Sequence, residues 1–273
     1  MPLTLMYITN NPFVAKVAQK SGVDRIFADM EYIGKEKRQH NMDTVKNHHT
    51  VEDVKNLRKV ITDSELLVRV NPLHDNSKNE IDSVISAGAD RIMLPMWKSV
   101  EEVDEFFKIV DNRVKTTLLL ENVEAAQCVE KLASFTNDFE VHIGLNDLHI
   151  SLNQKFLFEP LADGTVEKLS KSLNKNGIRF GIGGFGRIGE GILPAELIVS
   201  ENYRLGSQVS ILSRSFCDFN KVTDFENFES DFYDGVAKLR DYEKYICLQN
   251  SDFFENNRKE LCNKVEKIVS GIK

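Results

Sequence analysis

The stretch SKNEIDSVISAGADRIMLP, residues 77–95, contains the unit on which the fold prediction rests. Its first part, 77–87, has apolar residues at helical spacing and ends at Gly88, a residue type that commonly follows the last turn of a helix. Directly after it, Arg91–Leu94 is a short, almost continuously apolar run, which is typical of a strand buried on both faces. A helix followed at once by such a strand predicts one repeat of a βα architecture.

The same unit recurs along the chain. The predicted strands are short β-rich apolar runs at Leu3–Thr9, Arg25–Met30, Leu66–Val70, Arg91–Leu94, Thr116–Leu120, Val141–Ile143, Arg179–Ile182 and Gln208–Leu212. The predicted helices between them are Pro12–Ser21, Val51–Ile61, Ser77–Ala87, Ser99–Val110, Val123–Phe135, Thr165–Asn176 and Pro194–Tyr203. Strands that lack polar alternation are buried on both faces, as in a parallel sheet covered by helices.

This alternation predicts an α/β fold, a (βα)8 TIM barrel formed by a single domain of residues 1–273. A doubly wound open sheet is the alternative. Residues 224–273 read as a helical extension longer than one closing helix requires; they are predicted to pack within the domain or on a neighbouring subunit of a homo-oligomer. The connection from Glu31 to Thr50 is long and polar, and such connections in compact domains are usually functional or mobile.

Composition narrows the class of protein. The net charge of −7 argues against non-specific binding to nucleic acid or to an anionic membrane surface. No apolar run approaches the roughly 18 residues of a transmembrane helix, and the first residues lack the features of a signal peptide. The cysteines show no metal or redox spacing: Cys128, Cys217, Cys247 and Cys262. A cytoplasmic protein with reduced thiols is expected.

Polar residues at predicted strand ends are informative, because the active site of such a barrel lies at the C-terminal ends of its strands. Glu121 follows the fifth strand and Asp147 follows the sixth, so both are expected at one rim. Two carboxylates completed by water and substrate oxygens are typical of a Mg2+ or Mn2+ site. The alternative is a pair that caps helices or bridges to lysines.

Arg69, at the end of the apolar third strand, is a second candidate. A buried guanidinium needs an anion, and its planar fork suits a carboxylate or an enolate oxygen. It is predicted to pair with Asp29 or Glu31 at the end of the second strand, to contact a substrate oxygen, or to do both.

Five motifs together resemble one known family. They occur in the family's order, over most of residues 20–215: Ile26–Glu31 (IFADME), Val68–Asn71 (VRVN), Gly88–Pro95 (GADRIMLP), Leu120–Ala125 (LENVEA) and Ile143–Leu148 (IGLNDL). On these residues the chain resembles the HpcH/HpaI aldolases and citrate lyase β-subunits of the phosphoenolpyruvate/pyruvate barrel superfamily.

The resemblance implies a role for each strand end. Glu121 and Asp147 would bind the divalent cation, Arg69 would contact the keto-acid oxygen, and Asp29 and Glu31 would lie near the water of the cation. Three further residues at strand ends are expected to line the substrate site: Pro95, Gly144 and Asn146. The implied activity is a metal-dependent carbon–carbon lyase acting on a pyruvate-like 2-keto acid through an enolate.

One position departs from the family. Aldolases of this family have a histidine directly after the Asp-x-Glu motif, where this chain has Tyr32, and tyrosine with a pKa of about 10 is a poor base. The base would then be His40, His48, His49 or water bound to the cation. Two alternatives stay open: a citrate-lyase-like enzyme acting on a CoA thioester, and an inactive barrel used as a binding subunit.

Four other features have two interpretations each. The run Gly181–Gly191 contains G-x-G-x-x-G spacing but follows the seventh strand, so it does not indicate a dinucleotide site. Its Arg187 is predicted to meet a substrate phosphate or carboxylate, or else to belong to a lid or packed loop. His142 is interpreted as a packed histidine in preference to a ligand, and His149 as a helix-start residue in preference to a site residue. Trp97 is predicted to line the pocket or to cover the rim.

Overall fold

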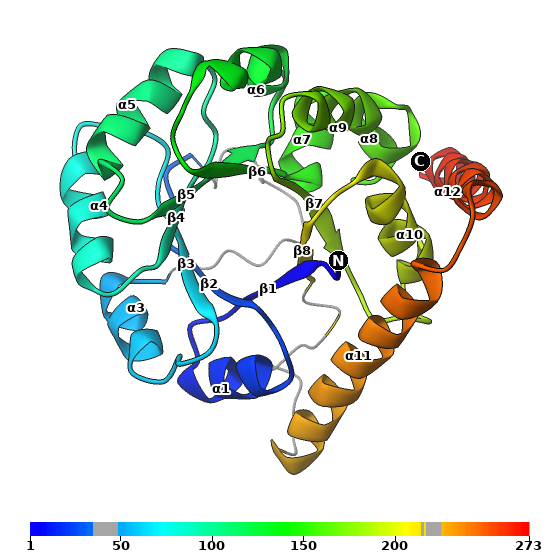
Figure 1. Ribbon diagram of the computed structural model, residues 1–273, viewed down its shortest axis with the longest axis horizontal. Helices are drawn as coiled ribbons and strands as arrows, with labels where there is room; N and C mark the ends of the chain where they lie inside the picture. Colours follow the sequence, from blue (N-terminus) through cyan, green and yellow to red (C-terminus); the bar gives the residue numbers. More distant parts are fainter. Residues whose placement is uncertain (35–48, 214–215, 217–224, 273) are drawn as a thin grey trace.

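The fold is a closed barrel of eight parallel strands surrounded by helices, seen here in a computed structural model (Figure 1). The structure describes residues 1–34, 49–213, 216 and 225–272. Each strand pairs with the next in sequence, and β8 closes the barrel on β1 through the register Leu5↔Ser210. Closure confirms the predicted TIM barrel and excludes the open sheet.

The strands follow the predicted runs to within a few residues. They are β1 (Thr4–Ile8), β2 (Arg25–Asp29), β3 (Glu65–Arg69), β4 (Arg91–Leu94), β5 (Lys115–Leu120), β6 (Phe139–Ile143), β7 (Phe180–Phe185) and β8 (Val209–Leu212). Their buried positions are nearly continuous, because one set of side chains fills the barrel and the other packs under the helices.

The helices also begin close to the predicted residues. They are α1 (Pro12–Lys20), α3 (Val51–Arg58), α4 (Ser77–Ser86), α5 (Val100–Val110), α6 (Val123–Cys128), α7 (Leu145–Ser151), α8 (Glu159–Ala162), α9 (Thr165–Lys175), α10 (Ala195–Leu205), α11 (Phe225–Ile246) and α12 (Ser251–Gly271). Side-chain caps explain several starts: Asn11 accepts from the Phe13 amide, and Thr50 forms a reciprocal capping box with Asp53. Within the described ranges, no helix has the length and apolarity needed to cross a membrane.

Two local predictions were wrong. One α-helix was expected over Val123–Phe135, but the α-helix ends at Cys128. The chain then forms a 3-10 helix, Val129–Ser134. His149 does not start a helix: α7 begins at Leu145, directly after β6, so His149 lies in its last turn, buried, with Nδ1 3.2 Å from the Leu145 carbonyl oxygen. The short α7 and α8 carried too few apolar repeats to be recognised from the sequence.

The barrel interior has three layers along the strand direction. At the N-terminal end, Arg25 and Arg91 form ion pairs with Glu65 and Glu140. A middle layer is apolar: Met6, Phe27, Leu67, Met93, Leu119 and Val209. The strands then end in Asp29 and Arg69, with Glu121 following β5, so the polar groups predicted to act lie at the C-terminal mouth.

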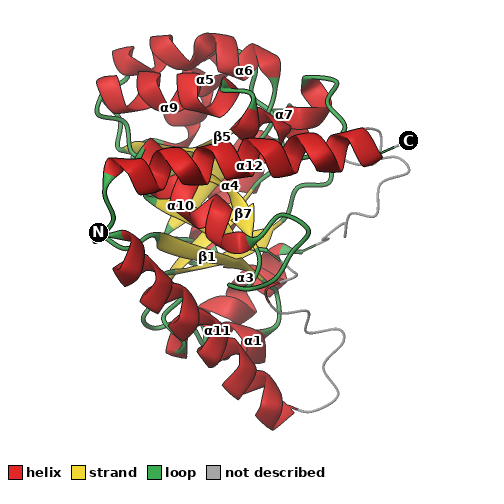
Figure 2. Cartoon of the chain, turned by 90° about the vertical axis from the view of Figure 1, so that its right-hand side faces the viewer, coloured by secondary structure: helices red, strands yellow, loops and turns green. Residues whose placement is uncertain are grey.

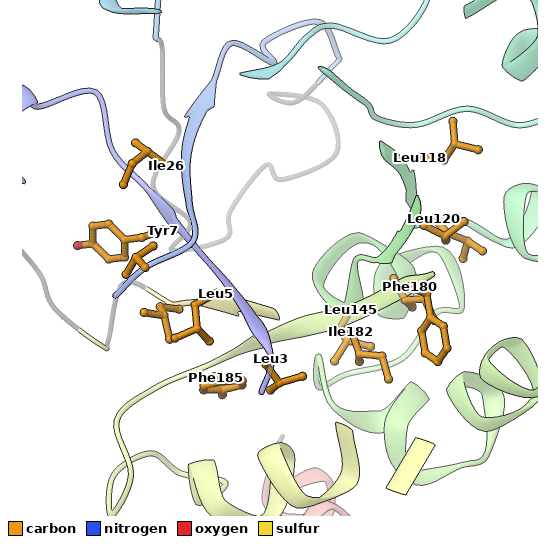
Figure 3. Packing of buried hydrophobic residues seen from close by; sticks show 14 of the residues in the cluster. Leu3, Leu5, Tyr7, Ile26, Leu118, Leu120, Leu145, Phe180, Ile182 and Phe185 are labelled. Atoms are coloured by element: carbon orange, nitrogen blue, oxygen red, sulfur yellow. The ribbon is translucent and has the colours of Figure 1, made fainter. Parts of the chain in front are cut away.

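A second core lies between the strands and the helices, and Figure 3 shows part of it, including Leu5, Phe180 and Ile182. His142 points into the barrel from β6, level with Leu119, and is buried. Burial lowers the pKa of His142 to about 4 and so favours the neutral ring. The burial of the side chain agrees with the interpretation as a packed histidine.

The two C-terminal helices lie against the barrel of the same chain. Helix α11 packs against α1 and α10, and α12 lies across α10 and α8 (Figure 2). Glu243 of α11 accepts a hydrogen bond from the Leu3 amide at 2.7 Å, and Arg240 donates to the Leu3 carbonyl at 2.8 Å. The extension therefore holds the start of β1; its packing on a neighbouring subunit stays a prediction.

Candidate active site at the barrel mouth

Arg69 is the centre of the mouth, held by two carboxylates from the end of β2. Its Nε and one terminal nitrogen each donate to Asp29 at 2.8 Å, and its other terminal nitrogen lies 3.3 Å from Glu31. Asp29 and Glu31 are 1% and 2% exposed, so the pairing is shielded from water. Burial alone would lower the pKa of Arg69, but the charges of Asp29 and Glu31 overcome it and raise the pKa. Arg69 is permanently charged and fixed in orientation.

Glu121 lies at the end of β5 and is 2% exposed. One of its oxygens accepts the backbone N–H of Met96 at 3.0 Å. Met96 has a φ of 53°, a left-handed conformation that is uncommon for residues other than glycine. Such outliers concentrate at functional sites, where the surrounding structure maintains them. This one directs a backbone amide to a buried carboxylate.

The electrostatic environment of Glu121 disfavours its charge. Burial is the largest cause of a raised pKa, and the charges of Asp147 and Glu31 raise it further. Arg69 and the Met96 amide act in the opposite direction but do not offset these causes. This environment therefore favours binding of either a proton or an additional cation by the carboxyl group.

Gly144 leaves the room that Glu121 occupies. A Cβ at position 144 would lie 3.1 Å from the Glu121 Cβ and 3.3 Å from its Oε2. The backbone of β6 approaches the carboxylate this closely because no side chain intervenes. Gly144 thus contacts Glu121, the candidate metal ligand. From the sequence, Gly144 was expected only to line the substrate site.

Asp147 belongs to the first turn of α7, one turn beyond the end of β6, and is half-buried. Its position supports part of the alternative considered for this residue, because a carboxylate in the first turn suits the positive end of a helix. Its charge also acts on Glu121, and its role as a metal ligand stays a prediction.

The residues present fit a divalent cation. No group of three or more His, Cys, Asp and Glu side chains arranged to hold a metal occurs in the described ranges. The predicted site needs only two carboxylates, with the remaining positions taken by water and substrate. At the mouth, Asp29 and Glu31 pair with Arg69, and the charge of Glu121 also acts on it. Burial, Asp147 and Glu31 raise the pKa of Glu121.

His49 returns the chain to the mouth at the end of the long connection. Its Nδ1 accepts the Asp29 amide at 2.9 Å, and its own amide donates to the Asp29 carbonyl at 3.2 Å. The Nδ1 lone pair is therefore engaged, which argues against His49 as the base through that atom. The other two histidines considered, His40 and His48, lie outside the described residues.

The remaining predicted residues take different positions. Tyr32 is 58% exposed, Pro95 is buried at the end of β4, and Asn146 is half-buried beside Asp147. Arg187 donates to the Phe216 carbonyl at 2.5 Å and lies 5.7 Å from the centre of the Phe216 ring, so it joins the segment after β7 to Phe216 after β8. Trp97 is 1% exposed, and its carbonyl accepts from Asn122, which places it beneath the rim.

Sequence reasoning placed Met96 and Asn71 at strand ends but did not foresee their contacts, the Met96 amide with Glu121 and the Asn71 side chain with the amides of Tyr32 and Ile33. The left-handed backbone of Met96 leaves no trace in residue type. Asn71 stood inside the quoted motif VRVN, two residues after Arg69, and that spacing was the available signal for a buried residue at the same strand end.

With this geometry in view, comparisons with known proteins become informative. Residues 3–155, more than half of the chain, match the sequence model of the HpcH/HpaI aldolase/citrate lyase family. The chain belongs to this family. The resemblance of the five motifs is thereby confirmed, and membership places the chain among lyase-type enzymes. No curated protein matches the sequence significantly.

Solved structures agree on the fold. An HpcH/HpaI aldolase from Desulfitobacterium hafniense DCB-2 is 14% identical, with a TM-score of 0.59 over 78% of this chain and 86% of that chain. A family protein from Burkholderia cenocepacia J2315 is 15% identical, with a TM-score of 0.59 over 78% and 88%. Macrophomate synthase is 18% identical, with a TM-score of 0.56 over 78% and 77%. At these identities the similarities establish the barrel alone.

Proposed function

We propose that this chain is a divalent-metal-dependent carbon–carbon lyase of the aldolase type, acting on a pyruvate-like 2-keto acid. The observation that carries the proposal is the opposition of charges at the mouth. A fixed guanidinium, Arg69, lies beside a buried carboxyl group, Glu121, whose pKa is raised by Asp147 and Glu31. Mg2+ and Mn2+ are the cations that such oxygen ligands prefer.

In this proposal each residue has a distinct role. Glu121 and Asp147 hold the cation, which supplies positive charge that stabilises an enolate. Arg69 places a second positive charge where negative charge develops on the substrate oxygen. Asp29 and Glu31 fix the guanidinium, so no reorganisation of Arg69 is needed during the reaction.

We also assign the residues that contact the substrate and the groups that accept the proton. The mouth contains Gly144 and Asn146 on the β6 side and Pro95 on the β4 side, and these residues would contact the small substrate. With Tyr32 largely exposed and the Nδ1 of His49 engaged, the carboxylates and water beside them are the groups we expect to accept the proton.

The test is deuterium exchange into the methyl group of pyruvate, measured by proton NMR in D2O with Mg2+ or Mn2+. Native protein should exchange the methyl protons, and a chelator should stop the reaction. Glu121→Gln should lower the rate by roughly 10³-fold, the scale of losing a main electrostatic group. Glu140→Gln, a buried glutamate at the opposite end of the barrel, is the matched control and should retain exchange per folded molecule.

Two results would reject the proposal. Absence of metal-dependent exchange in the native protein is the first, and unchanged exchange in Glu121→Gln is the second. Saturable CoA binding without pyruvate exchange would instead favour the citrate-lyase-like alternative, and absence of both would favour an inactive barrel.

A further inference from the structure

Asn71 lies at the end of β3, two residues after Arg69, and is 2% exposed. Its side-chain oxygen accepts the backbone N–H groups of Tyr32 and Ile33, both at 2.9 Å. These two amides directly follow Glu31 in the chain. One buried amide side chain therefore holds the backbone where it leaves the mouth.

The orientation of the Asn71 amide is determined by Glu80 on α4. The amide nitrogen of Asn71 donates to Glu80 Oε1 at 2.7 Å, and the Asn71 backbone N–H reaches the same oxygen at 3.3 Å. A carboxylate only accepts hydrogen bonds, so it selects the NH2 end of the side chain. The oxygen end must then face the amides of Tyr32 and Ile33.

The backbone at Glu31 is held on both sides, by Asp29 at Glu31 itself and by Asn71 at the two residues that follow. The Glu31 backbone N–H donates to Asp29 at 3.2 Å, and the next two amides along the chain are held by Asn71. Between these anchors the Glu31 carboxylate lies 3.3 Å from Arg69. Loss of the Asn71 oxygen would release the following backbone and with it the position of that carboxylate.

We infer that Asn71 is a positioning residue for the reaction: it fixes Glu31 against Arg69, and Glu80 fixes Asn71. The inference rests on the proposed function, since it assigns Asn71 to the same chemistry. A group displaced by about 1 Å from its productive position loses on the order of 10²-fold in rate, so a residue that touches no substrate has a measurable effect.

The charge of Glu80 makes a compensating pair possible. In Asn71→Asp, the new carboxylate has the shape to accept the same two amides, but it would face the Glu80 carboxylate across what was a 2.7 Å hydrogen bond. Repulsion between the two carboxylates should displace it from the amides. Combining Asn71→Asp with Glu80→Gln supplies an NH2 group that donates to the new carboxylate. Glu80→Gln alone keeps an acceptor for Asn71 and is the matched control.

The experiment measures two quantities in the native chain and the three variants. Hydrogen exchange by mass spectrometry on peptides covering residues 30–34 reports protection of the Tyr32 and Ile33 amides. Metal-dependent deuteration of pyruvate reports kcat and KM. Asn71→Asp should lose amide protection and lower kcat by between 10- and 100-fold with KM little changed, while the double variant should restore both to within about threefold.

Several outcomes would overturn the inference. Full kcat in Asn71→Asp despite lost protection is one, and a double variant that recovers protection but not kcat is another. Asn71→Ser, which removes the amide without adding charge, gives the same two readouts if the charged variant does not fold. Failure of the proposed function is seen separately, as absence of pyruvate deuteration in the native chain before any variant is compared.

Discussion

The two ends of the barrel interior contain buried glutamates with opposite electrostatics. At the N-terminal end, burial would raise the pKa of Glu140, but the hydrogen bond and charge of Arg25, with Arg91 beside them, lower it. At the C-terminal end, burial raises the pKa of Glu121, and Asp147 and Glu31 add to that rise. Similar burial thus yields a stable anion at one end and a carboxyl group in need of a partner at the other.

The difference is one of charge balance. In the N-terminal layer two buried arginines face two glutamates, and all four Arg–Glu combinations form ion pairs. In the mouth, Arg69 pairs with Asp29 and Glu31, while Glu121 lies in the field of two further carboxylates, Asp147 and Glu31. In a buried network with equal numbers of positive and negative charges, each charge has a partner within the fold. An excess of one sign favours the binding of a ligand of the opposite charge. The two ends of the barrel interior therefore differ in charge balance, and the excess of carboxylates lies at the end where we propose the metal site.

Glu140→Gln should have the largest effect on stability. Removal of one partner leaves Arg25 buried without full compensation, which costs roughly 3–5 kcal/mol of unfolding free energy. Glu121→Gln should not lower the metal-free stability, because it removes a disfavoured charge. Urea unfolding monitored by circular dichroism measures both variants. Equal destabilisation by the two substitutions would remove the distinction between the ends.

Gly144→Ala should have an intermediate effect, confined to the mouth. The added methyl group would lie 3.1 Å from the Glu121 Cβ, so the ligand must shift by a few tenths of an ångström. We expect Mn2+ affinity to fall about tenfold, close to the 1.4 kcal/mol that a tenfold change represents. Electron paramagnetic resonance of free Mn2+ gives the affinity. Gly271→Ala, where a Cβ would contact nothing within 4 Å, should leave the affinity unchanged.

The barrel was predictable because its evidence is local. A nearly continuous apolar run, such as Arg91–Leu94, can be recognised from a few neighbouring residues. The same holds for helix caps such as Asn11 and Thr50. Helix α7 was not predicted because it starts at Leu145 with only Gly144 between it and β6, and Gly144 provides no side-chain cap. A strand-to-helix junction of that kind has no marker of its own in residue type.

The site was predictable in its residue types but not in its contacts. Arg69 was selected because a charged side chain at the end of an apolar strand is costly without an anion. Glu121 and Asp147 were selected because residues that follow barrel strands lie at the rim where active sites form. That Met96 would present its amide to Glu121, or that His49 would bond the Asp29 backbone, depends on φ angles and on chain returns from distant positions. Such contacts require the assembled barrel.

The smallest effect, and the one that tests the comparison at both ends, is the pH dependence of stability without metal. The raised pKa of Glu121 means that the folded chain binds this proton more tightly than the unfolded chain. Stability from this group is present below its ordinary value of 4.5 and is lost as pH rises toward the folded pKa. Glu140 has the opposite sign: its lowered pKa contributes stability above 4.5 that is lost in acid.

Thermal unfolding of metal-free protein should therefore show a melting temperature that declines by a few degrees toward alkaline pH. Glu121→Gln should flatten this decline, and Glu140→Gln should leave it in place. Saturating Mn2+ should also flatten the decline in the native chain, because the cation stabilises the ionised carboxylate. A decline that persists unchanged in Glu121→Gln would show that the mouth carries no such excess of charge.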